Sequence, residues 1–250
     1  MGIQKNARQN KKNKTDGPQK KSSCKIIFDE NTKSMTPKED FLGNREKKKN
    51  LIFALLSDFK NNKVHAFLSE EDADRDIVNI ALKISEANPN VRIIGSDTDL
   101  LILLVALSPE NRNIMYHKQN SGKSSSAVIY SSKKLREEFK EINTLLLFAY
   151  AVTGCDTTSS FFGIGKIKAI EKIMSSQEAR NQAAQFLQND IGRNLLLVSG
   201  EKFILDLYGM SKYSNLNEAR YFMFIKLTKR SSLRSSFNLA KLPPTSESAH

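Results

Sequence analysis

The sequence predicts an α/β fold with a largely parallel sheet. Two observations support this prediction: short apolar segments with the composition of strands recur along the first half of the chain, and segments with a helical pattern lie between and after them. Strands that alternate with helices are typical of a parallel sheet covered by helices. The 250 residues suffice for one large domain or two small ones, each with its own core.

Five segments have the apolar character of strands. In chain order they are 24–30, 63–68, 91–95, 113–118 and 126–132. The first and the third run into acidic residues. The last two are separated by a polar loop rich in Gly and Ser, which is typical of a hairpin.

Seven segments have a helical pattern. They are 45–62, 69–87, 133–142, 143–154, 163–174, 177–190 and 193–209. Ser69 is expected to cap the second of them, with Asp72 at the capping-box position three residues later. The apolar stripe of that helix is predicted to consist of Ile77, Ile80, Ala81 and Ile84. The 143–154 segment is apolar on all sides, which predicts a buried helix.

Basic residues are concentrated at the two ends of the chain, whose formal net charge is +12. Residues 1–50 carry +8 and residues 219–241 carry +6, whereas residues 51–218 are nearly neutral at −1. Clustered Lys and Arg suit a polyanion such as nucleic acid, because binding releases counterions from the phosphates. A solubilising tail or a nuclear-import signal would explain the same charge equally well.

The number of cysteines and the length of the apolar runs predict where the protein is located in the cell. Cys24 and Cys155 are too few and too far apart for a disulfide framework or a zinc site, so we expect a nuclear or cytoplasmic protein that is not secreted. The longest apolar run, 100–107, is too short to span a bilayer, and no N-terminal segment resembles a signal peptide. We therefore expect no membrane partner.

Negative charge is concentrated at 70–76, where EEDADRD places five acids in seven positions before an apolar stretch. Asp74 lies three residues before Ile77 and should point toward the apolar face of its own helix. Asp72 lies in the first turn, where the helix dipole favours anions. Glu71 is on the same side as Asp74. At least two of these carboxylates are expected to converge near the sheet.

Further acids follow the ends of other predicted elements. Asp97 and Asp99 come after the apolar segment 91–95, and on an extended chain residues i and i+2 point to the same side. Open α/β sheets place their ligand crevice at this end of a strand. Asp156 follows the predicted buried helix, and Asp29 comes just after the first apolar segment.

Acids that converge beside a core need a counterion, because crowded carboxylates repel one another unless a cation holds them. Mg²⁺ and Mn²⁺ prefer oxygen ligands. Two such ions about 4 Å apart are the usual device for phosphodiester cleavage, one activating water and the other stabilising the leaving oxygen. Each motif alone would more often be a turn cap or a solvated helix start, but their joint occurrence predicts a metal site.

Three longer motifs, EEDADRDIVNIAL, IIGSDTDLLILL and LLLFAYAVTGCDTTSSFFGIGKIKAI, occur in this order. With them the chain resembles the flap endonuclease/XPG-type nucleases of the PIN-like superfamily, in particular the asteroid-like and transposon-associated versions. The resemblance covers about residues 24–245 and includes IIFDEN and FLGNREKKKNLI further upstream. It implies a three-layer, PIN-like α/β fold that hydrolyses phosphodiester bonds in DNA or RNA with Mg²⁺ or Mn²⁺ at a two-ion site.

The resemblance also implies roles for particular residues. The aspartates that would hold the ions and carry catalysis are Asp72, Asp74, Asp97, Asp99 and Asp156. Asp29 and Glu71 would be further metal ligands. The residues of the GIGK turn that would bind a nucleic-acid backbone are Gly163, Gly165, Lys166 and Lys168. Glycines before a helix start do allow a phosphate to approach the backbone amides.

The predicted organisation has four parts. They are a disordered basic tail at 1–22, a PIN-like nuclease core at 23–160, a helical nucleic-acid-binding part at 161–232 and a disordered tail at 233–250. Relatives have an earlier strand with another metal-binding Asp, and the Lys-rich residues 1–22 stand in its place. The alternative is therefore a catalytically inactive, truncated or transposon-derived protein that binds nucleic acid through the same fold.

Overall fold

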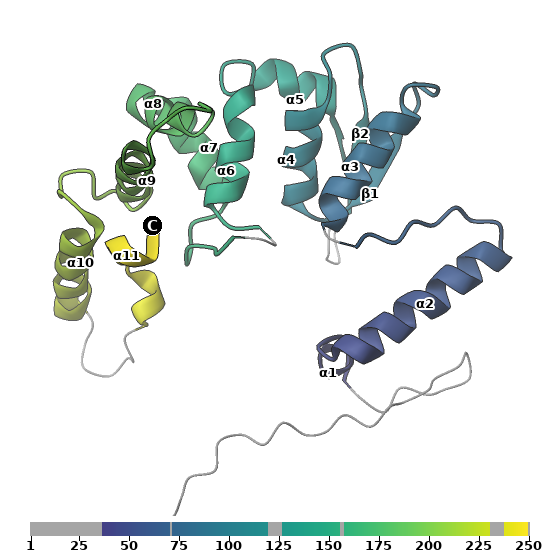
Figure 1. Ribbon diagram of the computed structural model, residues 1–250, viewed down its shortest axis with the longest axis horizontal. Helices are drawn as coiled ribbons and strands as arrows, with labels where there is room; N and C mark the ends of the chain where they lie inside the picture. Colours follow the sequence, from purple (N-terminus) through teal and green to yellow (C-terminus); the bar gives the residue numbers. More distant parts are fainter. Residues whose placement is uncertain (1–36, 71, 120–126, 156–157, 231–237, 250) are drawn as a thin grey trace, which may run out of the picture. The chain divides into compact units, whose positions relative to one another are not determined.

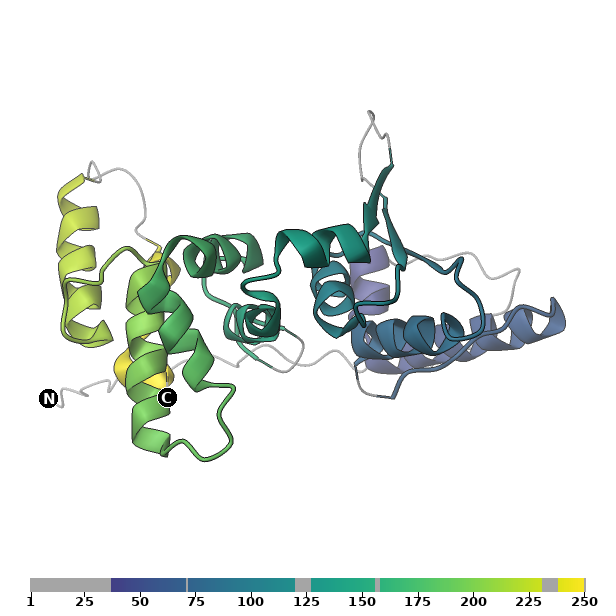
Figure 2. The same ribbon diagram turned by 90° about the horizontal axis from the view of Figure 1, so that it is seen from above.

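The computed structural model describes residues 37–70, 72–119, 127–155, 158–230 and 238–249. They belong to two compact units, one ending at Leu68 and the other beginning at Ser69 (Figures 1 and 2). The prediction of an α/β fold is confirmed, because the second unit combines a small sheet with helices. The predicted tail at 1–22 and the predicted strand at 24–30 lie outside the described residues.

The described residues of the first unit form two helices. They are α1 (Lys38–Leu42) and α2 (Arg45–Asn61). Asn44 caps α2, because its side chain accepts a hydrogen bond from the backbone N–H of Lys47 at 3.1 Å. The predicted helix at 45–62 is thereby confirmed.

The predicted strand at 63–68 is wrong. Lys63 has a positive φ of 58°, which turns the chain at the end of α2. Val64 and Phe67 are 51% and 71% exposed, and the segment pairs with no strand among the described residues. Apolar composition alone does not make a strand, because a strand is stable only when its backbone pairs with another.

The sheet of the second unit has three strands in the order β1–β2–β3. They are β1 (Arg92–Gly95), β2 (Met115–Lys118) and β3 (Val128–Ser131). β1 and β2 pair in parallel, whereas β2 and β3 pair antiparallel, as the predicted hairpin requires. The sheet is therefore mixed rather than mainly parallel. The physical reason is that β3 returns directly beside β2, without the crossover helix that a parallel pair needs.

The two faces of the sheet have different surroundings. Ile93 and Tyr116 are neighbours in the β1–β2 register, and both are buried on the face that the helices cover. Ile94, His117 and Ile129 are in register on the opposite face, where Ile94 is 60% and Ile129 is 47% exposed. The described residues therefore cover one face of the sheet.

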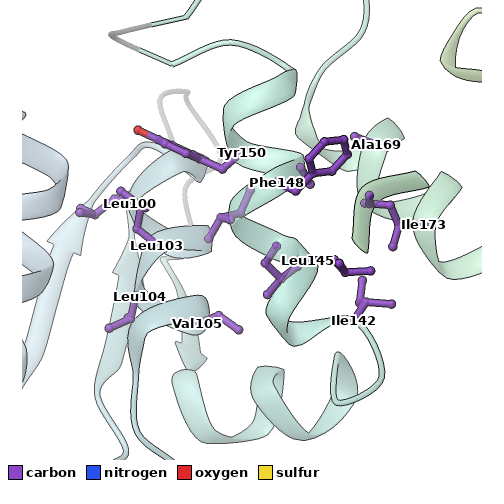
Figure 3. Packing of buried hydrophobic residues seen from close by; sticks show 14 of the residues in the cluster. Leu100, Leu103, Leu104, Val105, Ile142, Leu145, Phe148, Tyr150, Ala169 and Ile173 are labelled. Carbon is purple, nitrogen blue, oxygen red and sulfur yellow. The ribbon is translucent and has the colours of Figure 1, made fainter. Parts of the chain in front are cut away.

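Five helical segments lie before, between and just after these strands in the chain. They are α3 (Ala73–Ile84), α4 (Thr98–Leu107), α5 (Ser132–Glu138), the 3₁₀ helix η1 (Asn143–Leu145) and α6 (Leu146–Val152). α4 packs against α3 and α6 (Figure 1). Figure 3 shows Leu103 and Val105 of α4 gathered with Leu145 and Phe148, and all four are buried. The predicted buried helix at 143–154 is confirmed as η1 and α6.

The buried face of α3 differs from the predicted stripe. Val78 and Ala81 are buried, whereas Ile77 and Ile84 are 42% and 50% exposed. The predicted burial of Ala81 is confirmed, whereas the predictions for Ile77 and Ile84 are wrong. The orientation of the helix is set by packing against β1 and α4, and the smaller Val78 faces the core that the larger isoleucines were expected to occupy.

The C-terminal part of the second unit is helical. Its segments are α7 (Lys166–Ser175), α8 (Gln177–Gln185), α9 (Arg193–Leu207), α10 (Leu216–Arg230), the 3₁₀ helix η2 (Leu239–Lys241) and α11 (Ser246–Ala249). The first three confirm the predicted helices, and α10 was not predicted as a separate element. One hydrophobic core extends from α3 to α9, and a smaller one joins α9 to α10. Among the described residues, none of the helices is long and apolar enough to cross a membrane.

The prediction of disorder beyond residue 233 is wrong for residues 238–249. Leu242 is 5% exposed, and Pro243 is fully buried. The guanidinium of Arg220, on α10, donates a hydrogen bond to the carbonyl of Pro243. The double proline ends a helix but does not prevent packing, because proline without its N–H still buries apolar surface.

Candidate metal centre

Two Asp-x-Asp motifs form the same local structure at the starts of α3 and α4. In each, the first aspartate is the N-cap residue. Asp72 Oδ1 accepts a hydrogen bond from the backbone N–H of Asp74 at 3.0 Å, and Asp97 Oδ1 accepts one from Asp99 at 3.0 Å. The second aspartate of each pair lies in the first turn, where the helix dipole favours a carboxylate.

This arrangement corrects two predictions. Asp72 caps α3 in place of Ser69, whose hydroxyl instead hydrogen-bonds to Asp76 at 2.6 Å. Asp97 and Asp99 do not lie on an extended segment, because β1 ends before them and the apolar run that follows continues as α4. Their side chains come together through the geometry of a helix start and not through the alternation of a strand.

The packing of α3 against α4 brings three aspartates together. Asp74, Asp97 and Asp99 each offer a carboxylate oxygen, and these three atoms lie within 4.8 Å of one another. Around Mg²⁺, oxygens bound at about 2.1 Å are about 3 Å apart when adjacent and about 4.2 Å apart when opposite. The 4.8 Å limit is somewhat wider than these spacings, so the three aspartates form a candidate site whose oxygen donors are of the kind that divalent cations prefer.

Tyr116 of β2 lies beneath this group of aspartates. Its hydroxyl donates a hydrogen bond to the backbone carbonyl of Asp97 at 2.7 Å, and its side chain is completely buried. Burial raises the pKa of the Tyr116 phenol above 10.0, and the negative charges of Asp97 and Asp74 raise it further. The neutral phenol thus ties the start of α4, just after β1, to β2.

A cation lies against the same group. Lys166, the first residue of α7, places its Nζ 2.7 Å from Oδ2 of Asp99, and the two side chains are 16% and 19% exposed. The ammonium also donates a hydrogen bond to the carbonyl of Gly154 at 2.6 Å and lies 5.5 Å from the centroid of the Tyr150 ring. Three carboxylates and one ammonium leave a formal charge of −2, which one divalent ion neutralises.

Tyr150 of α6 lies beside the ammonium group of Lys166. Burial raises the pKa of its phenol, and the neighbouring Asp72, Cys155 and Asp99 raise it further. Its hydroxyl points away from the apolar cluster (Figure 3). The carboxylate of Asp72 is not one of the three whose oxygens lie within 4.8 Å of one another.

The turn after α6 directs the Gly154 carbonyl at Lys166. Gly154 has a φ of 97°, and an added Cβ would lie 2.5 Å from the Cα of Ser160, so only glycine fits there. Thr158 and Cys155 close the turn through two backbone hydrogen bonds of 3.2 Å each. The glycine of the motif is thus explained by the backbone geometry of this turn, whose carbonyl accepts the hydrogen bond from Lys166.

The structure brings together some of the predicted metal ligands. Asp74, Asp97 and Asp99 converge. The predicted ligands Asp29, Glu71 and Asp156 lie outside the described residues.

The predicted phosphate-binding residues occupy two different environments. Gly163 and Lys168 are exposed around the start of α7, and Gly165 is the N-cap residue of that helix. Lys166 instead contacts Asp99.

Two residues of the site had not been singled out in the sequence. Tyr116 lies in a strand pattern and Tyr150 in an apolar helix pattern, and both patterns predict residues of the hydrophobic core. The one signal that could have found Tyr150 is its hydroxyl within an otherwise apolar run, since a buried Tyr O–H needs a polar neighbour.

Comparisons of the chain with models of protein families, with curated proteins and with solved structures found no match.

Proposed function

We propose that the protein is a divalent-metal-dependent nuclease that hydrolyses phosphodiester bonds in DNA or RNA, in the nucleus or the cytoplasm. The observation that carries the proposal is the convergence of Asp74, Asp97 and Asp99 from two helix starts, just beyond the C-terminal end of β1. Open α/β sheets bind ligands at this end of a strand. Carboxylates held this close favour a bound cation, because they repel one another without one.

Mg²⁺ or Mn²⁺ is the ion that suits this donor set, since both prefer carboxylate oxygens. Such an ion, when bound, stabilises charge on a phosphoryl oxygen and lowers the pKa of water. Asp74, Asp97 and Asp99 would hold it. Tyr116 fixes the backbone of Asp97, and Lys166 orients the carboxylate of Asp99. These two contacts keep the carboxylates in place before the ion binds.

A second ion, as two-ion cleavage requires, needs further donors. Lys166 already balances part of the charge of Asp99, so the negative charge that remains on the three aspartates is neutralised by one divalent ion. We assign the second ion to Asp72, which is the N-cap residue of α3 and precedes Asp74 by two residues. The other ligands proposed for it are Asp156, Asp29 and Glu71.

The start of α7 is the proposed contact for the nucleic-acid backbone. α7 has ten residues, and its first backbone N–H groups have no partner within the helix, which suits a phosphate. Gly163 and Lys168 are exposed beside it. Because Lys166 on the same helix contacts Asp99, a phosphate bound here would lie close to the proposed metal centre.

We also propose that the small sheet is part of a three-layer PIN-like fold. Supporting this, Ile94 and Ile129 leave an apolar surface on the sheet face that the described residues do not cover. A further layer would bury this surface, at roughly 25 cal/mol per Å² of apolar area.

A second candidate is a catalytically inactive protein that binds nucleic acid through the same fold. The contact of Lys166 with Asp99 favours it, because an ammonium group already supplies positive charge where a metal ion would otherwise be needed. The two candidates differ in one measurable property, which is cleavage in the presence of a divalent ion.

The deciding experiment incubates the full chain with end-labelled single-stranded, duplex and branched DNA and RNA, with Mg²⁺, with Mn²⁺ or with EDTA. Asp97→Asn retains a good N-cap residue and removes one ligand charge, and Asp99→Asn removes another. Loss of a group that only orients a ligand costs about 10–100-fold, so each variant should lose at least about 100-fold in cleavage rate.

The matched control is Glu178→Gln, the same acid-to-amide change at an exposed position on α8. It should cleave at the wild-type rate. Binding without cleavage under every metal condition would reject the nuclease and favour the inactive protein. Cleavage that persists in both aspartate variants would reject the assignment of the site.

A further inference from the structure

A groove lies in the C-terminal helical part, between α10 and the turn that follows α9. Its volume is about 530 Å³, which is within the range of small-ligand sites. The side chains that matter for its chemistry are Lys212, Tyr213, Phe222, Ile225, Lys226 and Lys229. α9 and α10 pack side by side through the smaller hydrophobic core (Figures 1 and 2).

The groove uses the face of α10 that does not pack against α9. Leu216, Ala219 and Met223 follow a helical spacing and belong to the smaller core. Phe222, Lys226 and Lys229 follow the same spacing on another side of the helix, and all three are exposed. The exposed ring of Phe222 therefore lies on the same side of α10 as two lysines, away from the residues that pack against α9.

The charge of the groove selects an anionic ligand. Lys212, Lys226 and Lys229 line it, and none of the described residues that line it is acidic. The wider segment 219–241 has six basic residues and no acidic one. Clustered positive charge of this kind attracts polyanions, and for nucleic acids it supplies most of the binding that does not depend on sequence.

The aromatic residues narrow the choice among anions. The Tyr213 and Phe222 rings are stacked, with centroids 5.0 Å apart and planes inclined by 21°, and Phe222 is 43% exposed. Lys212 Nζ lies 4.9 Å from the centroid of Tyr213. Aromatic rings beside a basic groove are the combination that binds unpaired nucleotides, because bases stack on the rings while lysines contact the phosphates. A duplex keeps its bases stacked inside, and the acidic side chains of a peptide have no flat ring to stack on these residues.

We propose that this groove binds a single-stranded segment of nucleic acid, with a base stacked on Phe222 and phosphates on Lys212, Lys226 and Lys229. The assignment of this segment as part of a substrate rests on the proposed nuclease function. The binding itself does not depend on it, because the groove contains none of the proposed metal ligands. The groove would hold the unpaired part of a substrate whose cleaved bond lies elsewhere.

The test measures fluorescence anisotropy of labelled oligothymidylate, oligouridylate and a duplex, with the full chain in EDTA so that cleavage is prevented. Phe222→Leu retains an apolar side chain and removes the ring, and it should weaken single-strand binding at least about fivefold, the lower limit for losing one stacked base. Its effect on duplex binding should be much smaller. Equal weakening of both, or no weakening of either, would overturn the proposal.

A second variant combines Lys212→Gln, Lys226→Gln and Lys229→Gln. Each phosphate contact on a single strand contributes about 0.7 to the slope of log affinity against log salt, so the variant should reduce that slope by about 2. The matched control is the same change at three exposed lysines around α5, Lys133, Lys134 and Lys140. Equal effects of the two triple variants would overturn the proposal, as would competition by polyglutamate as effective as by unlabelled oligothymidylate. Single-strand binding in EDTA without any cleavage on metal addition would reject the nuclease alone.

Discussion

Replacing Lys166 tests the role of the cation beside the metal centre. In Lys166→Met the side chain retains most of its length and loses its charge, so Asp99 is left beside Asp74 and Asp97 without its ammonium partner. The Gly154 carbonyl also loses a hydrogen bond of 2.6 Å. The change is confined to electrostatics and hydrogen bonding, because methionine can fill the same space.

The size of the effect follows from the burial of the pair. An exposed ion pair contributes about 0.2–1 kcal/mol, and breaking a fully buried pair by removing one partner costs about 3–5 kcal/mol. The Lys166 and Asp99 side chains are 16% and 19% exposed, between the two limits but nearer the buried one. We expect the free energy of unfolding to fall by about 2–3 kcal/mol, or the Tm by roughly 4–12 °C for a domain of this size.

Urea denaturation, followed by far-UV circular dichroism in EDTA and in excess Mn²⁺, measures this loss. Mn²⁺ should reduce it, because an ion that binds the folded variant offsets the unpaired carboxylates and stabilises the folded state. Lys168→Met is the control, since Lys168 is an exposed lysine on the same helix and its loss should cost less than about 0.5 kcal/mol. The reasoning is refuted if the two variants lose the same stability in EDTA, or if Mn²⁺ leaves the loss at position 166 unchanged.

Two further predictions concern the support of the site. Gly154→Ala combines a φ of 97° with a clash against Ser160, so it should lower the free energy of unfolding by more than about 3 kcal/mol. Gly163→Ala has a φ of 70° but no atom within 4 Å of the new Cβ, so it should lower the free energy of unfolding by only about 1–2 kcal/mol. Thermal melts compare the two, and equal losses would contradict the close approach in the turn. Because the folded pKa of Tyr116 is raised above its unfolded value of about 10, its contribution to stability is complete below pH 10 and is lost as the pH rises further. Urea midpoints from about pH 8 to about pH 11 should therefore fall less steeply in Tyr116→Phe than in the wild type, and parallel profiles would show that this phenol does not titrate differently on unfolding.

Part of the fold could be predicted from local patterns. The helix at 45–62, the buried helix at 143–154 and the hairpin of β2 and β3 were predicted, because each depends on periodicity or on a short connection. The predictions were wrong where contacts with residues distant in the sequence determine the structure. Residues 63–68 have the composition of a strand but find no partner among the described residues, and residues 238–249 look like a tail but pack against Arg220.

The candidate site divides in the same way. Asp74 could be proposed from its place before an apolar helix face, and Asp97 and Asp99 from their place after an apolar segment, although the conformation expected for the last two was wrong. A helix cap is settled by hydrogen bonds within three residues, but whether Asp-x-Asp continues as strand or helix depends on what the following apolar run packs against. The ion pair of Lys166 with Asp99 could not be predicted, since it joins two segments that meet only through the turn at Gly154.

The sequence by itself determined that two Asp-x-Asp motifs precede apolar runs and that positive charge collects at 219–241. The tertiary structure alone decided that Asp74 meets Asp97 and Asp99, that an ammonium group lies against them, and that Phe222 shares a groove with three lysines. The physical reason is how far apart in the chain the interacting residues lie. Caps and periodicities are interactions between residues close in the chain, whereas a charge cluster or a groove exists only after burial of the core has fixed which helix faces meet.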